Sequence, residues 1–509
     1  MKLFALPKDD WRLIVGGAVL VTIAYPPFHL ILPSFLCVVP AILLILDGEQ
    51  DPSPFRRHLV QGFWFGLLAH GLTLYWMVVA LWHFTPLSGL GYAATIVILA
   101  LYMSLVFAVS GWVTRTTKVS LVITFPVLWT AAEWVIGHQG EVGFPWLGLG
   151  SSLTGYPVLV QIADIVGARG ITMLLVLANV ALALAWVDRR QRARAPVLVG
   201  GVVIGVIVAA AYGVVRERAL PLRPVGTIAL LQPNVGFEEK WEPGAQDSIL
   251  YATLDLARTA ISETAPDVVI WPEAAVPGYF HRHAGWRADI SELSRTTGVP
   301  QLVGGLDLEW ESADEYDYFN AAFWFDETGD FDRQPVYHKR YLVPITERVP
   351  FVNPRWFKLR FFGGFGIGRE RAVYETPVGR FGVFICYESA FEDLPREYRA
   401  RGADFLVNIT NDAWFGRTSA PYQHAAHLVM RAIETRAGIA RAANSGISEF
   451  VDPLGREHRR TGLYQMTFVT DTLMTSDVVP FYTRVGDWVG LLSLVMTVGL
   501  VGFAFWSRR

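Results

Sequence analysis

Apolar residues gather in long, nearly uninterrupted runs over the first 215 positions of this sequence, and one further run lies shortly before its end. A run of about 20 apolar residues is long enough to cross the hydrocarbon core of a bilayer as an α-helix. The pattern therefore predicts eight membrane-spanning helices. They are expected at residues 11–26, 30–46, 59–80, 89–112, 119–137, 170–187, 196–215 and 487–506.

Between residues 216 and 486 the pattern changes to short apolar stretches that alternate with amphipathic segments. Strands are expected at 225–234, 267–277, 301–308, 320–325, 381–385 and 404–410, and helices at 246–263, 284–297, 391–401 and 422–443. Strands that alternate with helices predict a layered α/β domain, with its functional side chains at one edge of the sheet. We therefore expect a membrane domain at 1–215, an α/β domain at 216–486, and a final span with a short tail at 487–509.

Composition agrees with a membrane protein. Hydrophobic residues make up 52% of the 509 positions and charged residues 17%, and the mean hydropathy is +0.34. A soluble globular chain is less apolar and more charged than this. The formal net charge of −3 gives no reason to expect binding to nucleic acid. Because Cys37 and Cys386 are the only cysteines, a disulfide framework is excluded in practice.

The basic residues near the predicted spans lie on one side of an eight-span arrangement. They are Lys2, Lys8, Arg12, Arg56, Arg57, Arg115, Lys118, Arg189, Arg190, Arg192, Arg194, Arg508 and Arg509. The loops on the other side, around 27–30 and 81–88, carry no lysine or arginine, and 138–169 carries Arg169 alone. By the positive-inside rule both chain ends are cytoplasmic and residues 216–486 lie on the opposite side.

Two ionisable residues, His70 and Glu133, fall within predicted spans. Such residues are functional candidates by default, because a charge at membrane depth is costly. Pairing with a partner or placement at the interface is the simpler interpretation for both. The sequence does not assign them a role.

Three side chains at the ends of expected elements carry the candidate chemistry of the α/β domain. Glu273 follows the apolar strand DVVIWP, and Cys386 ends the apolar strand FGVFI. Lys339 follows the strand pair near 320–337. Together they would supply a base, a cation and a nucleophile. Taken alone, a free cysteine is more often a small core residue, and a lysine beside an arginine is more often exposed.

The order of these residues resembles the Glu-Lys-Cys triad of the carbon–nitrogen hydrolase (nitrilase) superfamily. The match lies in WPE at 271–273, YHK at 337–339 and CYE at 386–388. Further segments resemble the apolipoprotein N-acyltransferase family of bacterial inner membranes. They are QPNVGFEEKW at 232–241, KRYLVPITERVP after the lysine, NDAWFG at 411–416 and the outer loop GFPWLGLG.

This resemblance covers essentially the whole chain and implies its architecture. It implies a multi-pass α-helical membrane domain of about eight spans, with a nitrilase-like αββα sandwich inserted before the last span. It also places the catalytic domain in the periplasm and the spans in the inner membrane. One departure is Ile345-Thr346-Glu347, where the family has an aromatic residue, a glycine and a glutamate. The glutamate itself is retained.

The family chemistry implies acyl transfer in two halves. Cys386 would attack an ester carbonyl of a membrane phospholipid and form a thioester. The N-terminal α-amine of a diacylglyceryl-modified apolipoprotein would then receive the acyl chain as an amide. Glu273 is the implied general base, and Lys339 is the cation that stabilises the thiolate and the oxyanion.

Four other residues have supporting roles in this interpretation. By resemblance, Glu347 and Glu388 orient the lysine and the site loop. Asn320 and Tyr387 are expected to add polar support.

Aromatic residues suggest a lipid-facing surface. The loop FVNPRWFKLRFFGGFGIG contains six of them together with basic residues and glycines, as is typical of a mobile lid at a bilayer interface. Phe357 and Phe361 are its expected lipid-binding residues, and Trp414 and Phe415 are expected to serve the same surface. Trp241 would line the acyl site by resemblance, although a packing role suits this tryptophan equally.

The expected partners are a phospholipid acyl donor, a diacylglyceryl-modified apolipoprotein and the bilayer. The sequence contains no glycine-rich phosphate loop and no Cys/His metal spacing, so we expect neither a cofactor nor a metal. One alternative is a membrane-tethered nitrilase-type amidase that hydrolyses an amide or ester, which the spans and the aromatic loop disfavour. The other is a non-enzymatic transporter or scaffold, which the intact triad makes improbable.

Overall fold

The computed structural model describes residues 6–49, 51–82, 88–190, 194–240, 242, 244–310, 316–352 and 364–508. The chain divides into two compact units. Unit 1 comprises Met1–Gln139, Gly143–Ala219 and Val485–Arg509, and unit 2 comprises Gly140–Val142 and Leu220–Arg484. The domain limits expected from the sequence differ from these by a few residues, apart from the small segment Gly140–Val142.

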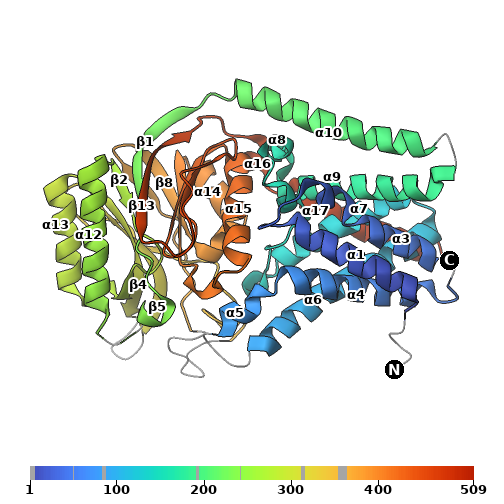
Figure 1. Ribbon diagram of the computed structural model, residues 1–509, viewed down its shortest axis with the longest axis horizontal. Coiled ribbons are helices and arrows are strands. Elements are labelled where there is room, and N and C mark those ends of the chain that lie inside the picture. The colour runs from blue at the N-terminus through green and yellow to red at the C-terminus, as the bar shows by residue number, and fades with distance from the viewer. Residues whose placement is uncertain are drawn as a thin grey trace. The chain divides into compact units, whose positions relative to one another are not determined.

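Helices build unit 1 (Figure 1). The longer ones are α1 (Lys8–Ala24), α4 (Pro54–Thr73), α6 (Ser88–Thr117), α7 (Leu121–Gly137), α9 (Ala163–Val187), α10 (Arg194–Ala219) and α17 (Trp488–Trp506). Shorter ones are α2 (Ile31–Leu36), α3 (Val39–Gly48), α5 (Trp76–Trp82) and α8 (Pro157–Val160). Every predicted span therefore corresponds to one helix or to two successive helices.

Length and composition support membrane crossing for most of these helices. Among the described residues, five segments are long and apolar enough to span a membrane, or six if the bent pair α4–α5 forms one span. The chain bends by 58° between the two helices of that pair. Helices α1 and α7 have 17 residues each, slightly fewer than the usual 20. Unit 1 is therefore a multi-pass membrane domain, and the count of eight spans stays a prediction.

The two ionisable residues within the predicted spans have partners inside unit 1. The Glu133 carboxylate accepts hydrogen bonds from the Trp129 indole, the Thr172 hydroxyl and the backbone N–H of Leu149, each at 2.9 Å. His70 Nδ1 lies 2.8 Å from the carbonyl oxygen of Gly66 in its own helix. These contacts agree with the simpler, structural interpretation of both residues.

Two β-sheets form the centre of unit 2. The first contains β1 (Arg223–Gln232), β2 (Val268–Ile270), β3 (Val276–Tyr279), β4 (Gln301–Trp310), β5 (Tyr316–Phe325), β6 (Tyr337–His338) and β13 (Thr467–Thr475), in the order β13-β1-β2-β4-β5-β6 with β3 beside β4. The second contains β7 (Val373–Thr376), β8 (Gly379–Ile385), β9 (Phe405–Thr410), β10 (Gly438–Ala443), β11 (Glu449–Val451) and β12 (Glu457–His458), in the order β12-β11-β10-β9-β8-β7. The central strands of each sheet are parallel, and antiparallel strands flank them.

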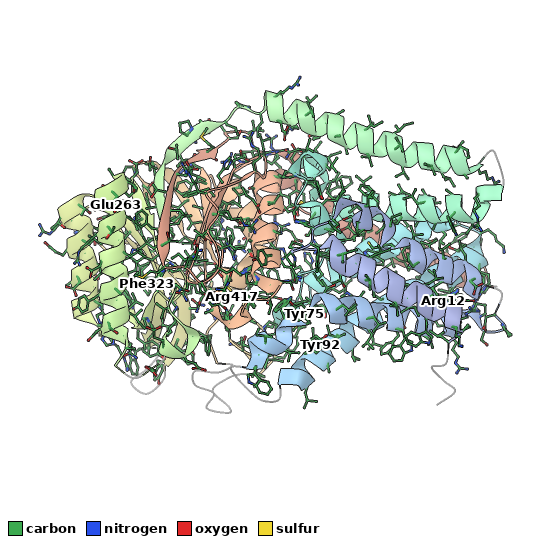
Figure 2. All side chains as sticks on the ribbon, in the orientation of Figure 1. Arg12, Tyr75, Tyr92, Glu263, Phe323 and Arg417 are labelled. Carbon is green, nitrogen blue, oxygen red and sulfur yellow. The ribbon has the colours of Figure 1, made fainter. Side chains whose placement is uncertain are left out.

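Helices cover the outer face of each sheet, which gives the predicted αββα order (Figure 1). Helices α12 (Gln246–Thr264) and α13 (Ala284–Thr297) lie on the first sheet, and α14 (Asp393–Ala400) and α15 (Ala420–Thr435) on the second. The core between the first sheet and its helices is apolar, with Trp271 and Phe323 fully buried. Figure 2 labels Phe323 in this core and the exposed Glu263 on α12.

Two predictions of secondary structure are wrong. The segment 422–443 is not one helix, because α15 ends at Thr435 and the run GIARAA forms β10, parallel to β9. Arg436 has a left-handed backbone (φ 51°), which ends the helix. A short alanine-rich run has no hydrophobic periodicity that distinguishes a strand from a helix, so the pairing with β9 determines its structure.

The expected strand 267–277 is interrupted and forms β2 and β3. No element was expected where β13 pairs with β1.

Candidate active site

The three candidate groups meet where strands of the two sheets end. Glu273 follows β2, Lys339 follows β6, and Cys386 follows β8 as the first residue of a short 3₁₀ helix. The three residues are 3%, 0% and 2% exposed, respectively. The thiol interacts electrostatically with both the lysine and the glutamate. The structure therefore brings together three residues that are separated by up to 113 positions in the sequence (386 − 273).

Two carboxylates hold the ammonium group of Lys339. Its Nζ donates to Oε1 of Glu347 at 2.9 Å and to Oε1 of Glu273 at 3.3 Å. Burial by itself would lower the pKa of Lys339, but these two carboxylates, with a smaller effect of the thiolate, raise the pKa above its usual value. Lys339 is therefore a permanent cation within the buried site.

Glu273 is held by groups from both sheets. Its Oε1 accepts from Asn320 Nδ2 at 2.6 Å, and its Oε2 accepts from the backbone N–H of Asn411 at 2.7 Å. The side-chain amide of Asn320 also donates to Glu347 at 3.1 Å, and the backbone carbonyl oxygen of Asn320 accepts from the backbone N–H of Lys339 at 2.8 Å. The side chain and backbone of Asn320 thus fix the positions of all three charged residues.

The surroundings of Cys386 favour the protonated thiol. Burial raises the pKa of this thiol well above its usual value, and the neighbouring carboxylate of Glu273 raises it further. Lys339 lowers the pKa of Cys386, as expected from the sequence, but this effect is the smaller one. A base must therefore remove the proton before the sulfur can attack.

The backbone of Cys386 has a left-handed conformation, with φ 52°. A non-glycine residue in this region is held there by its surroundings at a cost of about 1–3 kcal/mol. The surroundings include His424, whose Nε2 lies 2.9 Å from the carbonyl oxygen of Cys386. The chain turns at this point, so Cys386 does not continue the strand β8.

Glu388 ties the segment after Lys339 to the end of β8. Its carboxylate accepts from the backbone N–H groups of Arg340, Tyr341 and Ile385 at 2.6–3.1 Å, and from the Tyr337 hydroxyl at 2.8 and 2.9 Å. Burial raises its pKa to about 7, although the backbone donors oppose this shift. Glu388 thus bonds to the chain directly before Cys386 and directly after Lys339.

A second buried charge network supports the cysteine turn, and sequence reasoning missed it. His424 Nδ1 lies 2.9 Å from Oδ1 of Asp412, and the guanidinium of Arg441 donates to Oδ2 of Asp412 at 3.1 Å. Burial opposes ionisation, but His424 and Arg441 lower the pKa of Asp412 to about 2. Asp412 lies in the NDAWFG segment, whereas His424 and Arg441 lie in the stretch that was wrongly expected to be one helix.

Lys240 is another group that the sequence did not single out. It is fully buried at the end of the short helix α11 (Phe237–Lys240), and its Nζ lies 3.5 Å from the carbonyl oxygen of Glu273. Burial lowers its pKa to about 8, against the opposing effect of Glu273. The QPNVGFEEKW segment was the available signal, but it drew attention to the tryptophan.

The predicted aromatic residues differ in their surroundings. Tyr387 is buried, and its ring meets that of Phe391 edge to face at 5.2 Å. Phe415 is 8% exposed and packs edge to face on His424 at 6.0 Å, whereas Trp414 is half-buried and stacks on Phe237 at 6.5 Å. The lipid-binding roles of Trp414 and Phe415 stay predictions. Trp241, Phe357 and Phe361 lie outside the described residues.

Among the residues that the structure describes, one cluster has the composition of a metal site. Asp307, Glu309 and His338 place ligand atoms within 4.8 Å of one another. The Asp307 carboxylate is already bonded to His338 Nε2 at 2.7 Å and to His281 Nδ1. These contacts satisfy the buried carboxylate without an ion.

Family comparisons cover most of the chain. Residues 227–478 match the carbon–nitrogen hydrolase family, and residues 17–181 match the apolipoprotein N-acyltransferase N-terminal domain. Unit 2 is therefore a carbon–nitrogen hydrolase domain, joined in one chain to a multi-pass membrane domain.

Relatives match over nearly the full length. An apolipoprotein N-acyltransferase from Geobacter metallireducens is 33% identical over 95% of this chain and 93% of its own, and one from Methylococcus capsulatus is 29% identical over 98% and 96%. A solved amidase from Nesterenkonia sp. is 20% identical over 52% of this chain and 95% of its own, with a TM-score of 0.39. The chain belongs to the apolipoprotein N-acyltransferase family, and it is an acyltransferase.

Proposed function

We propose that this protein transfers a fatty acyl chain from a membrane phospholipid to the N-terminal α-amine of a diacylglyceryl-cysteine apolipoprotein. The observation that carries the proposal is the buried Glu273–Lys339–Glu347 contact beside the buried thiol of Cys386, in a chain whose full-length relatives are named for this activity. A thioester on Cys386 would connect the donor and acceptor reactions.

In the first half-reaction, the Glu273 carboxylate takes the thiol proton while the sulfur of Cys386 attacks the ester carbonyl carbon. The Lys339 ammonium lies beside both groups and stabilises the negative charge that develops on the carbonyl oxygen. Collapse of the tetrahedral intermediate breaks the bond to the glycerol oxygen. That oxygen receives the proton from Glu273, and a lysophospholipid leaves.

The proton transfer suits a buried site because it conserves charge. Glu273, Glu347 and Lys339 carry a net charge of −1 (two carboxylates and one ammonium) while the thiol is neutral. Once Glu273 is protonated and the sulfur ionised, the net charge is still −1. Only the position of the charge changes, so the step avoids the cost of creating a new charge in a medium of low dielectric constant.

In the second half-reaction, the α-amine nitrogen attacks the thioester carbonyl carbon and loses a proton to Glu273. The carbon–sulfur bond breaks, and the sulfur of Cys386 regains the proton. The product is an amide-linked third acyl chain, and the enzyme returns to its initial protonation state. Water must be kept from the thioester, and we propose this role for the aromatic and basic segment at 351–368, on the basis of its sequence.

The same proposal includes an orientation. Both chain ends lie in the cytoplasm and unit 2 lies in the periplasm, anchored in the inner membrane. The support is the one-sided distribution of arginine and lysine along the spans of unit 1.

Intact mass spectrometry of the purified protein tests the mechanism. After incubation with phospholipid, the protein should gain the mass of one fatty acyl group, and a diacylated lipopeptide should discharge it. Cys386→Ala should gain nothing, whereas Cys37→Ala, which removes the other buried cysteine, should behave as wild type. Discharge by water but not by the lipopeptide would indicate the amidase-type hydrolase. An active protein without any adduct would overturn the covalent mechanism.

A further inference from the structure

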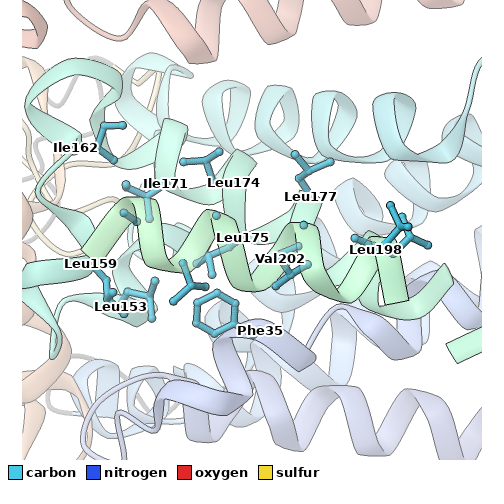
Figure 3. Close-up of a pocket in the computed structure, with 17 residues that line it drawn as sticks. Phe35, Leu153, Leu159, Ile162, Ile171, Leu174, Leu175, Leu177, Leu198 and Val202 are labelled. Atoms are coloured by element: carbon cyan, nitrogen blue, oxygen red, sulfur yellow. The ribbon is translucent and has the colours of Figure 1, made fainter. Parts of the chain in front are cut away.

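A cavity of about 370 Å³ lies within unit 1, between α9 and α10 (Figure 3). Leu174 and Leu177 of α9 face it from one side, and Leu198 and Val202 of α10 from the other. All 17 residues that line it are apolar or glycine. Its size is in the range of about 300–1,000 Å³ that is typical of sites for small ligands. An occupant must therefore be apolar over the part that enters.

Helix α10 packs closely on its neighbours at Gly213, whereas open space lies beside its middle part. A Cβ atom added to Gly213 would lie 1.9 Å from the carbonyl oxygen of Val158 in α8, so the two helices touch there. A Cβ atom added to Gly201 or Gly205 would meet no atom within 4 Å. Only 6% of the most apolar 18-residue segment of α10 is buried, whereas 50% of the corresponding segment of α9 is buried.

Small residues line the open part of α10. Gly201, Gly205 and Ala209 recur at intervals of four and all line the cavity. This spacing usually marks a close contact between two membrane helices. Here Gly201 and Gly205 are exposed and border the cavity, so they preserve room beside the helix. The lining of α10 runs from Val197 to Ala209, about 18 Å along the helix axis, which is close to the roughly 15 Å of one bilayer leaflet.

Two exposed arginines, Arg189 and Arg194, lie near the start of α10, where Val197 and Leu198 line the cavity. The segment 188–194 contains four arginines and one aspartate, a net charge of +3. Arg194 begins α10, three residues before Val197, and Arg189 follows the end of α9; both are exposed. The guanidinium of Arg189 lies over the ring of Trp186 at 4.6 Å. Basic residues near a membrane surface attract anionic lipid headgroups.

We propose that this groove binds a phospholipid with an anionic headgroup. One acyl chain occupies the cavity between α9 and α10, and the phosphate lies at Arg189 and Arg194. The lipid fills the space that the glycines leave open and joins α10 to the rest of unit 1. This site is independent of the chemistry at Cys386, because every lining residue belongs to unit 1.

Native mass spectrometry of the full-length protein, with phosphatidylglycerol or phosphatidylcholine added in equal amounts, tests the site. Wild type should retain one phosphatidylglycerol about ten- to thirty-fold more tightly than phosphatidylcholine. The double variant Gly201→Leu/Gly205→Leu fills the groove and should lose this lipid. The matched control is Gly499→Leu/Gly502→Leu on α17, where added side chains also meet no atom within 4 Å, and it should retain the lipid.

The arginines have a separate readout. Arg189→Gln/Arg194→Gln should bind the two phospholipids about equally, while its melting temperature without added lipid stays near that of wild type. Equal retention of phosphatidylglycerol by the groove variant and the α17 control would overturn the proposal. So would equal affinity of wild type for both lipids. If wild type forms a dimer and the groove variant does not, the glycines instead contact a second copy of the chain.

Discussion

The centre of unit 2 and the helix α10 of unit 1 contrast in what surrounds their side chains. Lys339 is fully buried, yet it stays charged because two carboxylates and the groups around them compensate it. Most of α10 is exposed and apolar, and open space lies beside Gly201 and Gly205. In the centre of unit 2 the charged groups depend on a few specific partners, whereas no protein atom lies within 4 Å of a Cβ atom added to Gly201 or Gly205 on α10.

This difference predicts how each region responds to substitution. Removal of one charge from a buried group leaves its partners uncompensated, which costs several kcal/mol. Addition of a methyl group where no atom lies nearby costs little. The two regions therefore should differ in the size of the effect and in which property changes, activity in unit 2 and lipid binding or packing in unit 1.

The largest expected effect is that of the nucleophile. Cys386→Ala should reduce acyl transfer by about 10⁴-fold or more, because no other group forms the thioester. Cys37→Ala, a change of the same kind at a buried position in unit 1, should leave the turnover number near that of wild type. Transfer of a labelled acyl chain to a lipopeptide measures both. Residual activity above 1% in Cys386→Ala would break the contrast between the regions.

Removal of the buried cation should have the next largest effect. Lys339→Met should reduce the turnover number by about 10²–10³-fold and lower the unfolding free energy by about 3–5 kcal/mol, because Glu273 and Glu347 are left without a counter-charge. Lys339→Met/Glu347→Gln removes one of those charges and should regain much of the melting temperature without regaining activity. If the double variant melts no higher than the single one, charge compensation is not what Lys339 contributes to stability.

A smaller effect concerns pH and Glu388. Its pKa of about 7 lies above the usual 4.5 of a glutamate, so between these values the folded protein binds more protons than the unfolded chain. Stability from this group is present below pH 4.5 and is lost as the pH rises to 7, by at most on the order of 3 kcal/mol.

The comparison of wild type with Glu388→Gln isolates this contribution. The melting temperature of wild type, measured by scanning fluorimetry, should fall relative to that of the variant between pH 4.5 and 7. Other buried carboxylates, such as Glu449 with its pKa of about 7, are present in both proteins and cancel in the difference. A constant difference across this range would show that Glu388 keeps one protonation state.

The smallest effects are expected on α10, where two glycines differ in their surroundings. Gly213→Ala places a methyl group against the Val158 carbonyl and should lower the unfolding free energy by about 1–3 kcal/mol. Gly205→Ala meets no atom and should change it by no more than about 0.5 kcal/mol. Melting temperatures of the two variants in the same detergent test this. Equal losses would mean that α10 is packed as closely at Gly205 as at Gly213.

Much of the architecture could be predicted from the sequence because burial leaves a local signature. Apolar runs of spanning length predicted the helices of unit 1, and alternating strands and helices predicted the layered unit 2. The order Glu273, Lys339, Cys386 at the ends of strands indicated one site. Short apolar runs such as GIARAA carry no such signature, and for that reason β10 was mistaken for the end of a helix.

The contacts of the site were decided by the tertiary structure alone. Asn320 reaches Glu273 across 47 positions, and the N–H of Asn411 reaches it across 138. Arg441 of β10 reaches Asp412 because β10 pairs in parallel with β9, and His424 reaches it from the helix α15. Hydrogen bonds and ion pairs act over about 3 Å, so their partners are set by which strands lie side by side, and no local pattern of residues records that arrangement.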